Sequence, residues 1–283
     1  MNAQLVTVEL RQWIVDQAKA GCRPEDVLQS MRASGWDEEV AVNALEETLQ
    51  KYLNEHAQKQ ALPPAVKVPE PDLSQSPTTL WADGREVRVL VAMRNPRVVV
   101  FGNLLSDEEC DGLIEFARPR IARSETVINA TGGSEVNEAR TSDGMFFERG
   151  ENPICERVER RLAALLNWPV VNGEGLQILR YRPGAEYKAH HDYFDPAQPG
   201  SPTILKRGGQ RVGTMLLYLN TPPRGGATAF PDVALEVAAV KGNGVFFSYD
   251  RPHESTRTLH AGTPVVEGEK WVATKWLREG EFR

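Results

Sequence analysis

The chain has 283 residues, 41% of them hydrophobic, so it can bury a large core and has room for one large and one small domain. Its 33 basic and 39 acidic residues give a net charge of -6 without any basic cluster, which argues against a nucleic acid partner. No secretory leader pattern and no apolar run of membrane length is visible, so we expect a cytoplasmic protein with no membrane partner. Its three cysteines are widely separated and lack disulfide or metal-ligand spacing, which predicts free thiols.

The first segment, residues 4–53, has the apolar spacing of three short helices. Gly21 is expected to end the first helix, Pro24 to begin the second and Asp37 to cap the third. The glycine-aromatic turn and the sequence AVNAL in the last helix resemble ubiquitin-associated-type three-helix modules. We therefore expect residues 1–55 to form a docking or dimerisation module, with a merely stabilising appendage as the alternative.

A change of composition marks the next segment, residues 56–79, which is rich in Gln, Ala, Ser and Pro. Five prolines fall in ALPPAVKVPEPDLSQSPTT, which predicts an extended linker of polyproline character. The expected domains are thus a three-helix module (1–55), a Pro-rich linker (56–79) and a large C-terminal domain (80–283).

The C-terminal region begins with two strand-like runs, VRVLVAM and RVVVFGN, followed by two helices. A capping box, Ser106 with Glu109 three residues later, indicates the start of the first helix. The second helix spans NPICERVERRLAALLN. Short strand-like segments separated by Gly and Pro turns then follow: GLQILRY, YKAHHDYF, VGTMLLYLN, GATAFP, GNGVFFSYD, TLHAGTPVV and KWVATKWL. This order predicts an α+β fold in which helices pack on a β-sandwich or barrel.

Two histidines and an aspartate stand close together in YKAHHDYF. If this run is a strand, His190 and Asp192 share one face and His191 points to the other. An imidazole and a carboxylate side by side are two thirds of the facial triad that holds non-haem Fe(II). His253 and His260 are the candidates for the third ligand, and we favour His260 because it lies on an expected strand rather than in a turn.

A lysine follows the candidate ligands at a position that bears on the cosubstrate. Three ligands on one face leave three positions on iron, of which a 2-oxo acid occupies two and oxygen one. If that acid is 2-oxoglutarate, its far carboxylate needs a cation. Lys270 is expected to share a strand face with Val272, Thr274 and Trp276. An ammonium among such largely apolar neighbours is costly unless it is paired with an anion. A solvated position at the strand's edge is the alternative.

Three ordered motifs, LQILRYRPGAEYKAHHDYF, RVGTMLLYLNTPPRGGATAFPD and TLHAGTPVVEGEKWVATKWL, closely resemble the prolyl 4-hydroxylase family, especially the collagen-type catalytic domain. The resemblance spans about residues 95–278. It implies a double-stranded β-helix, or jelly roll, with supporting helices. It also implies an Fe(II)/2-oxoglutarate-dependent dioxygenase that uses O2, releases succinate and CO2, and takes ascorbate as a reductant.

The resemblance assigns roles residue by residue. It makes His190, Asp192 and His260 the iron ligands and Lys270 the partner of the distal carboxylate of 2-oxoglutarate. It implies that further cosubstrate contacts come from Thr214 and Tyr218 at that carboxylate, Tyr181 at the chelating end and Trp276 as an aromatic wall near iron. The positions that match the family's peptide-binding residues are Arg140, Ser142, Glu174, Tyr187 and Arg211. Arg278 departs from several relatives, which have histidine there.

The substrate that this resemblance favours is a proline ring in an extended peptide or protein. The same scaffold could instead hydroxylate another residue or a small molecule, which the substrate-loop positions would decide. A non-enzymatic binding or adaptor protein is a further alternative, against which the intact Lys270 and the three candidate ligands argue.

Overall fold

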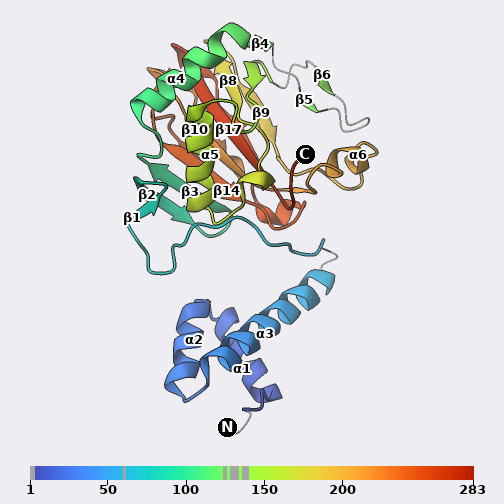
Figure 1. Cartoon of the computed structure of the whole chain (residues 1–283). Helices are drawn as coiled ribbons and strands as arrows, with labels where there is room; N and C mark the ends of the chain where they lie inside the picture. The colour runs from blue at the N-terminus through green and yellow to red at the C-terminus, as the bar shows by residue number, and fades with distance from the viewer. Residues whose placement is uncertain (1–3, 60–61, 124–125, 128–133, 136–139) are drawn as a thin grey trace. The chain divides into compact units, whose positions relative to one another are not determined.

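The computed structural model describes residues 4–59, 62–123, 126–127, 134–135 and 140–283 (Figure 1). By its contacts the chain forms two compact units, Met1–Ala65 and Val66–Arg283. None of the helices in these described ranges is long and apolar enough to cross a membrane.

The first unit consists of the three expected helices, α1 (Val8–Lys19), α2 (Pro24–Ala33) and α3 (Glu38–Lys59). Pro24 is the first residue of α2, and the Asp37 carboxylate accepts hydrogen bonds from the first turn of α3. Six buried apolar side chains form the core of the unit: Ile14, Val27, Met31, Ala41, Ala44 and Leu45. The helix α3 continues to Lys59, past the expected start of the linker at residue 56, because NEHAQK still consists mostly of residues compatible with a helix.

The second half of the expected linker packs against the second unit instead of running free, and residues 60 and 61 lie outside the described residues. The Val66 amide donates to the Asp250 carbonyl at 2.8 Å, and the Glu70 amide donates to the Leu166 carbonyl at 2.9 Å. The Glu70 carboxylate also pairs with Arg97. Pro69 and Pro71 are buried, and Val68 and Leu73 pack on the core of the second unit. The segment packs on the second unit because the apolar side chains that lie among its prolines are removed from water there.

A nine-stranded antiparallel sheet forms the centre of the second unit. Its order is β1 (Thr79–Ala82), β2 (Arg85–Met93), β3 (Arg97–Gly102), β14 (Gly244–Ser248), β10 (Arg211–Tyr218), β17 (Lys270–Arg278), β8 (Gln177–Tyr181), β7 (Asp143–Phe146) and β4 (Ala122–Arg123). A smaller sheet has the order β13 (Leu235–Val237), β12 (Thr228–Phe230), β15 (His260–Gly262) and β9 (Tyr187–His190). Two short pairs complete the strands, β11 (Arg224–Gly225) with β16 (Val265–Glu267) and β5 (Thr126–Val127) with β6 (Ser134–Glu135).

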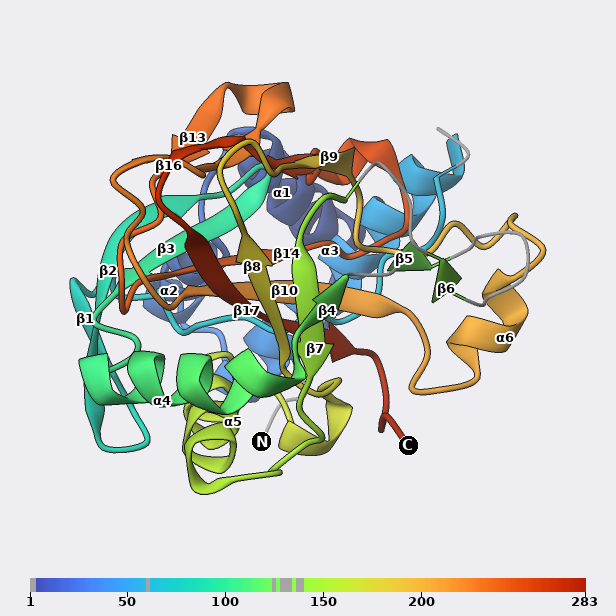
Figure 2. The ribbon, with the colours of Figure 1, turned by 90° about the horizontal axis from the view of Figure 1, so that it is seen from above.

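Helices α4 (Asp107–Ala117) and α5 (Pro153–Leu165) cover one face of the large sheet, and the small sheet lies over the other (Figures 1 and 2). The remaining helices are short: α6 (Ser201–Leu205), η1 (Arg118–Arg120), η2 (Val170–Asn172), η3 (Pro231–Val233) and η4 (Glu254–Thr256). The expected capping box of α4, formed by Ser106 and Glu109, is present. This is the expected double-stranded β-helix with supporting helices.

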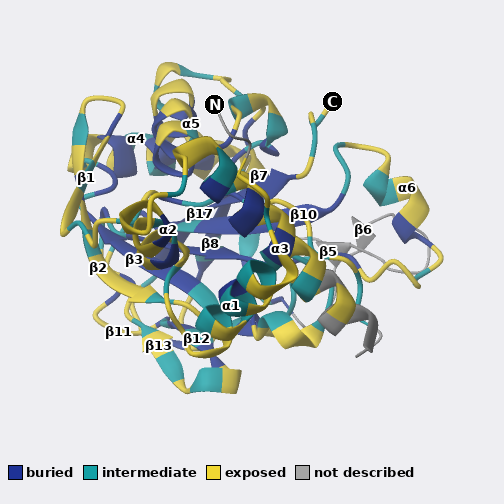
Figure 3. Ribbon diagram, turned by 90° about the horizontal axis from the view of Figure 1, so that it is seen from below, coloured by how far each residue is buried: buried dark blue, intermediate teal, exposed yellow. Residues whose placement is uncertain are grey.

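Strand β17 is buried along its whole length, and its residues contribute to two separate hydrophobic cores (Figure 3). Trp271, Ala273 and Leu277 belong to the core between the large sheet and the helices. Val272 belongs to the second core, between the two sheets. Strand alternation therefore directs the even-numbered residues, Lys270 included, toward the small sheet.

Two expected strands end earlier than the sequence pattern suggested. Strand β9 stops at His190, which is its last residue paired with β15. Asp192 therefore lies in the turn that follows rather than on the strand. The main chain then turns so that the amide and carbonyl of Phe194 both bind the Gln210 side chain. TLHAGTPVV divides into β15 and β16 around Pro264, which has no N–H to donate to a ladder.

Candidate metal and cosubstrate site

The structure brings His190, Asp192 and His260 together at one end of the small sheet. His190 ends β9 and His260 begins β15, and the two are directly paired across the ladder. One ligand atom from each of the three side chains lies within 4.8 Å of the others. Each imidazole Nε2 is 3.6 Å from an Asp192 oxygen. His253 lies elsewhere, where its Nδ1 accepts from the Ser255 amide at 3.0 Å.

Both imidazoles of the cluster are held in the tautomer that a metal ligand requires. The Nδ1 of His190 lies 2.8 Å from the Lys188 carbonyl, and the Nδ1 of His260 lies 3.0 Å from the Thr258 carbonyl. A carbonyl only accepts, so each Nδ1 carries the proton and each Nε2 presents a lone pair toward Asp192. Burial, and then the neighbouring His190, lower the pKa of His260 to about 4, so this ring is neutral at physiological pH.

The third member, Asp192, is buried and ionised. Burial opposes ionisation, but at low pH the positive charges that His260 and His190 then carry, together with Arg211, hold the pKa of this carboxyl well below its usual range. Two nitrogen lone pairs thus face an anionic carboxylate in a buried space. This donor set, two imidazoles and one carboxylate, fits a divalent iron ion.

A pocket joins this cluster to Lys270. Apolar side chains form much of its wall, with two threonines among them: Leu179, Tyr181, Leu216, Thr228, Val272, Thr274 and Trp276. Arg140 and Tyr187 line it beside the cluster, together with Ala261 and Gly262 of β15. The pocket therefore offers a metal-binding group and a cation within one mainly apolar enclosure, as a small dicarboxylate would require.

Lys270 is a buried cation without a counter-ion in the part of the chain that the structure describes. No hydrogen bond or ion pair joins its ammonium to the described residues, and its nearest aromatic neighbours are the rings of Tyr181 at 5.5 Å and Tyr218 at 5.7 Å. Burial lowers the pKa of Lys270 to about 8. An uncompensated buried charge is costly, so the position is suited to an anion that enters with a ligand.

A family model described as the 2OG-Fe(II) oxygenase superfamily matches residues 176–278. Prolyl 4-hydroxylase 5 of Arabidopsis thaliana is 39% identical over 210 residues, which are 66% of this chain and 70% of that protein. Prolyl 4-hydroxylase 1 of the same plant is 39% identical over 224 residues, 70% of this chain and 77% of that protein. The chain belongs to the prolyl 4-hydroxylase family.

A solved structure extends the likeness to the fold. The viral collagen prolyl hydroxylase of Paramecium bursaria Chlorella virus-1, in its 2OG complex, superposes with a TM-score of 0.50 and 30% identity. The match covers 64% of this chain and 95% of that one. The resemblance stated from the three sequence motifs is thereby confirmed, and the cluster and Lys270 are residues of this prolyl 4-hydroxylase homologue that fit Fe(II) and 2-oxoglutarate.

Thr214 does not lie where the resemblance placed it. It is paired with Trp276 on β17, six residues from Lys270 and hence about 20 Å along the strand. Its hydroxyl lies 2.7 Å from Asp192 Oδ2, at the metal end of the site. The expectation that Thr214 donates to the distal carboxylate is therefore wrong. Strand alternation correctly predicts that Thr214 and Tyr218 share a face of the strand. It does not predict how far along the strand each residue lies from Lys270.

Thr228 is a pocket residue that sequence reasoning missed. It is buried, lines the pocket with Lys270, and its hydroxyl accepts a 2.8 Å hydrogen bond from Tyr218. The glycines that closely precede Thr228 are the sequence feature that could have indicated its place near Lys270. A Cβ on Gly226 would lie 3.2 Å from the Lys270 Cδ, so glycine lets the chain that leads into β12 approach the lysine closely.

Two aromatic residues expected beside the cosubstrate both line the pocket. Tyr181 is the direct cross-strand partner of Lys270. Its place at the chelating end of the cosubstrate stays a prediction. Trp276, paired with Thr214, lies toward the metal end, where the Arg211 guanidinium stacks 3.8 Å from its ring.

The residues assigned to peptide binding divide into two groups. Arg140 and Tyr187 line the pocket, where the Arg140 guanidinium lies 4.8 Å from the Tyr187 ring and that ring stacks on His190 at 3.6 Å. Burial raises the pKa of Tyr187 to about 12, so the phenol stays protonated. Ser142, two residues after Arg140, is fully buried, and its part in peptide binding stays a prediction.

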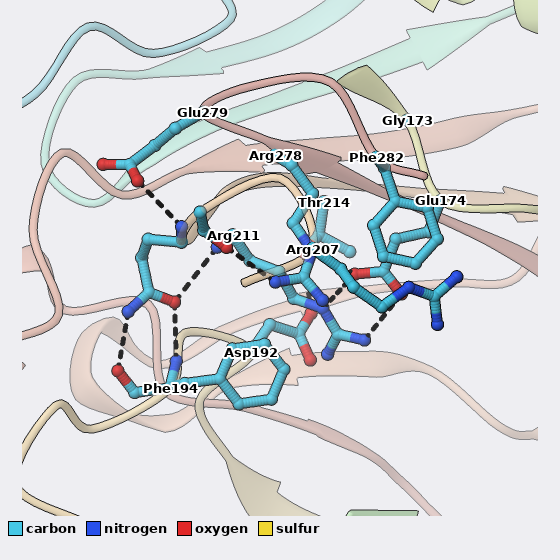
Figure 4. A network of polar contacts seen from close by, with 12 residues as sticks. Gly173, Glu174, Asp192, Phe194, Arg207, Arg211, Thr214, Arg278, Glu279 and Phe282 are labelled. Carbon is cyan, nitrogen blue, oxygen red and sulfur yellow. Dashed lines mark hydrogen bonds and ion pairs between the residues drawn. The ribbon is translucent and has the colours of Figure 1, made fainter. Parts of the chain in front are cut away.

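Glu174 and Arg211 form the second group, which lies behind the pocket wall in a buried network (Figure 4). The Glu174 carboxylate accepts from Arg211 at 2.7 and 3.0 Å and from Arg278 at 2.7 Å. Burial opposes ionisation of Glu174, but the two guanidinium groups hold its pKa below the usual range. Arg278, the departure from several relatives, is thus a partner of Glu174, and peptide binding by Glu174 and Arg211 stays a prediction.

Proposed function

We propose that this protein is a prolyl 4-hydroxylase that hydroxylates proline in a peptide or protein, using Fe(II), 2-oxoglutarate and O2. The observation that carries the proposal is one pocket that contains both the His190, Asp192, His260 cluster and the Lys270 ammonium, which has no counter-ion among the described residues. Its relatives of 39% identity are named prolyl 4-hydroxylases, and this is the support for proline as the substrate.

In this proposal each residue of the pocket has a task that its position supports. His190, Asp192 and His260 would hold Fe(II) on one face and leave its other positions open. Lys270 would bind the distal carboxylate of 2-oxoglutarate, and Thr228 could donate a second hydrogen bond there. The apolar side chains around them exclude water from the reaction.

When bound, iron supplies the oxidising chemistry: one oxygen atom of O2 enters succinate as 2-oxoglutarate loses CO2, and the other enters a C–H bond as hydroxyl. In this proposal Arg140 and Tyr187, which line the pocket beside His190, would orient the peptide whose C–H bond reacts. We include ascorbate in the proposal as the reductant that restores iron after turnover without substrate.

The test is a turnover assay on the full chain with Fe(II), 2-oxoglutarate, ascorbate and a proline-rich peptide. We expect succinate together with a peptide heavier by one oxygen atom, located on proline by fragmentation mass spectrometry. The Asp192→Ala variant should remain folded and lose both products, because it lacks one of the three metal ligands. Succinate without peptide oxidation would contradict proline as the substrate and favour another residue or a small molecule. No succinate from the metal-loaded protein would contradict the dioxygenase.

For the first unit we propose docking of a partner or dimerisation, in the cytoplasm. Its support is apolar surface, since Leu5 is 82% and Val8 78% exposed. The free Cys22, Cys110 and Cys155 are in keeping with a reducing compartment. Light scattering of the full chain and of residues 66–283 tests dimerisation: a monomeric full chain would contradict it.

A further inference from the structure

Two hydroxyl groups connect the metal cluster to the interior of the large sheet. The Thr214 Oγ1 lies 2.7 Å from Asp192 Oδ2 and 3.0 Å from the Tyr249 hydroxyl, and all three residues are buried (Figure 4 shows Thr214 beside Asp192). The carboxylate only accepts, so the single hydroxyl proton of Thr214 goes to Asp192. Tyr249 must then be the donor to Thr214. Both hydrogen bonds are therefore directed toward the carboxylate.

The elements that carry these hydroxyl groups are fixed more firmly than Asp192 itself. Thr214 lies in β10, at the centre of the sheet, paired with Phe247 on one side and Trp276 on the other. Tyr249 directly follows β14, and its amide donates to the Val212 carbonyl at 3.2 Å.

Asp192 has no comparable support from its own backbone, because β9 ends at His190. The two histidines are each held by a strand ladder and by an Nδ1 hydrogen bond. Among the described residues, the hydrogen bond that reaches the Asp192 carboxylate comes from Thr214.

We propose that Thr214, supported by Tyr249, is a positioning residue of the metal site: it fixes the Asp192 carboxylate through Oδ2 and leaves Oδ1 for the metal. A carboxylate that binds through one oxygen keeps a further position on the metal free for cosubstrate or O2. The inference rests on the proposed metal site but is independent of which substrate is hydroxylated.

The variants follow from the direction of the hydrogen bonds. Thr214→Val keeps the side-chain shape and removes the donor, so Asp192 can rotate and metal binding should weaken by about 10- to 100-fold. Thr214→Ser restores the hydroxyl and should bind metal within about threefold of the parent. Tyr249→Phe leaves Thr214 as donor but removes its support, so a smaller loss, about threefold to tenfold, is expected.

Thr228→Val is the matched control, because Thr228 is also a buried threonine bonded to a tyrosine, Tyr218, but its hydroxyl does not reach Asp192. Its affinity for metal should stay within twofold of the parent. The measurement is a Co(II) titration of the full chain by calorimetry and visible absorption, without 2-oxoglutarate or peptide. Circular dichroism and thermal melting establish that each variant is folded.

The inference is overturned if Thr214→Val binds Co(II) within twofold of the parent, or if Thr214→Ser loses as much affinity as Thr214→Val. Should Thr214→Val fail to fold, the comparison of Tyr249→Phe with the parent decides, and equal affinities overturn the inference. A parent that does not bind Co(II) overturns the proposed metal site and the inference with it. A parent that binds Co(II) and hydroxylates no proline overturns the substrate alone, with the Thr214 result still valid.

Discussion

Lys270 lies in an environment unlike that of an ordinary surface lysine. Its ammonium is buried, has no counter-ion among the described residues, and shares a pocket with the metal cluster. The solvated position at a strand edge that the sequence left as an alternative is thereby excluded. Two experiments separate a role in cosubstrate binding from a structural one.

The first experiment replaces Lys270 by Ala. The distal carboxylate of 2-oxoglutarate would lose a charge-assisted hydrogen bond of about 1.5 to 3 kcal/mol, so the KM for 2-oxoglutarate should rise roughly ten- to hundredfold. The affinity for Co(II) should barely change, because Lys270 is not a ligand. Lys270→Arg should recover only part of the loss, since a planar guanidinium replaces a compact ammonium. An unchanged KM in both variants would exclude Lys270 from the cosubstrate site.

The second experiment uses pH. Burial lowers the pKa of Lys270 to about 8, and the ammonium is the form that binds a carboxylate. The affinity of the metal-loaded protein for 2-oxoglutarate should therefore be constant below about pH 8 and fall as the pH rises above it, by up to tenfold per unit. Lys270→Arg should remove this fall, because a guanidinium stays charged throughout. The same fall in Lys270→Arg would assign it to another group.

At the scale of elements, Glu174 joins β10 and β17 by binding Arg211 and Arg278 in a buried place. Glu174→Ala would leave both guanidinium groups without this acceptor, and we expect the free energy of unfolding to fall by about 3 to 5 kcal/mol. Glu267→Ala is the control, since its ion pair with Arg224 is exposed and should contribute less than about 1 kcal/mol. Urea denaturation of both variants measures the difference, and similar midpoints would contradict a structural role for Glu174.

The elements also show which features a sequence pattern can predict. Alternation placed Lys270, Val272, Thr274 and Trp276 on one face, and all four line the pocket. Pairing of His260 with His190 across β9 and β15 depends on residues seventy positions apart, which no local pattern specifies. The end of β9 at His190 and the position of Thr214 opposite Trp276 are likewise set by partner strands.

For the whole molecule, the main error of the sequence reasoning concerns residues 66–78. Proline content predicted a free linker there, because composition reports chain stiffness but carries no information about a partner surface. In the structure the segment includes buried Pro69 and Pro71, and its Glu70 binds both Arg97 and the Leu166 carbonyl. The catalytic unit therefore begins at residue 66 rather than at residue 80.

This boundary gives a prediction about truncation. A chain of residues 66–283 should fold, bind Co(II) and form succinate from 2-oxoglutarate as the full chain does, because it contains the complete second unit. A chain of residues 79–283 should melt at a distinctly lower temperature or precipitate. It lacks the Glu70 contacts and exposes the core surface that Val68 and Leu73 cover. Calorimetry of the two truncations compares them directly. Equal melting temperatures would mean that residues 66–78 add nothing to the unit, whereas an inactive 66–283 chain would show that the three-helix unit is needed to complete it.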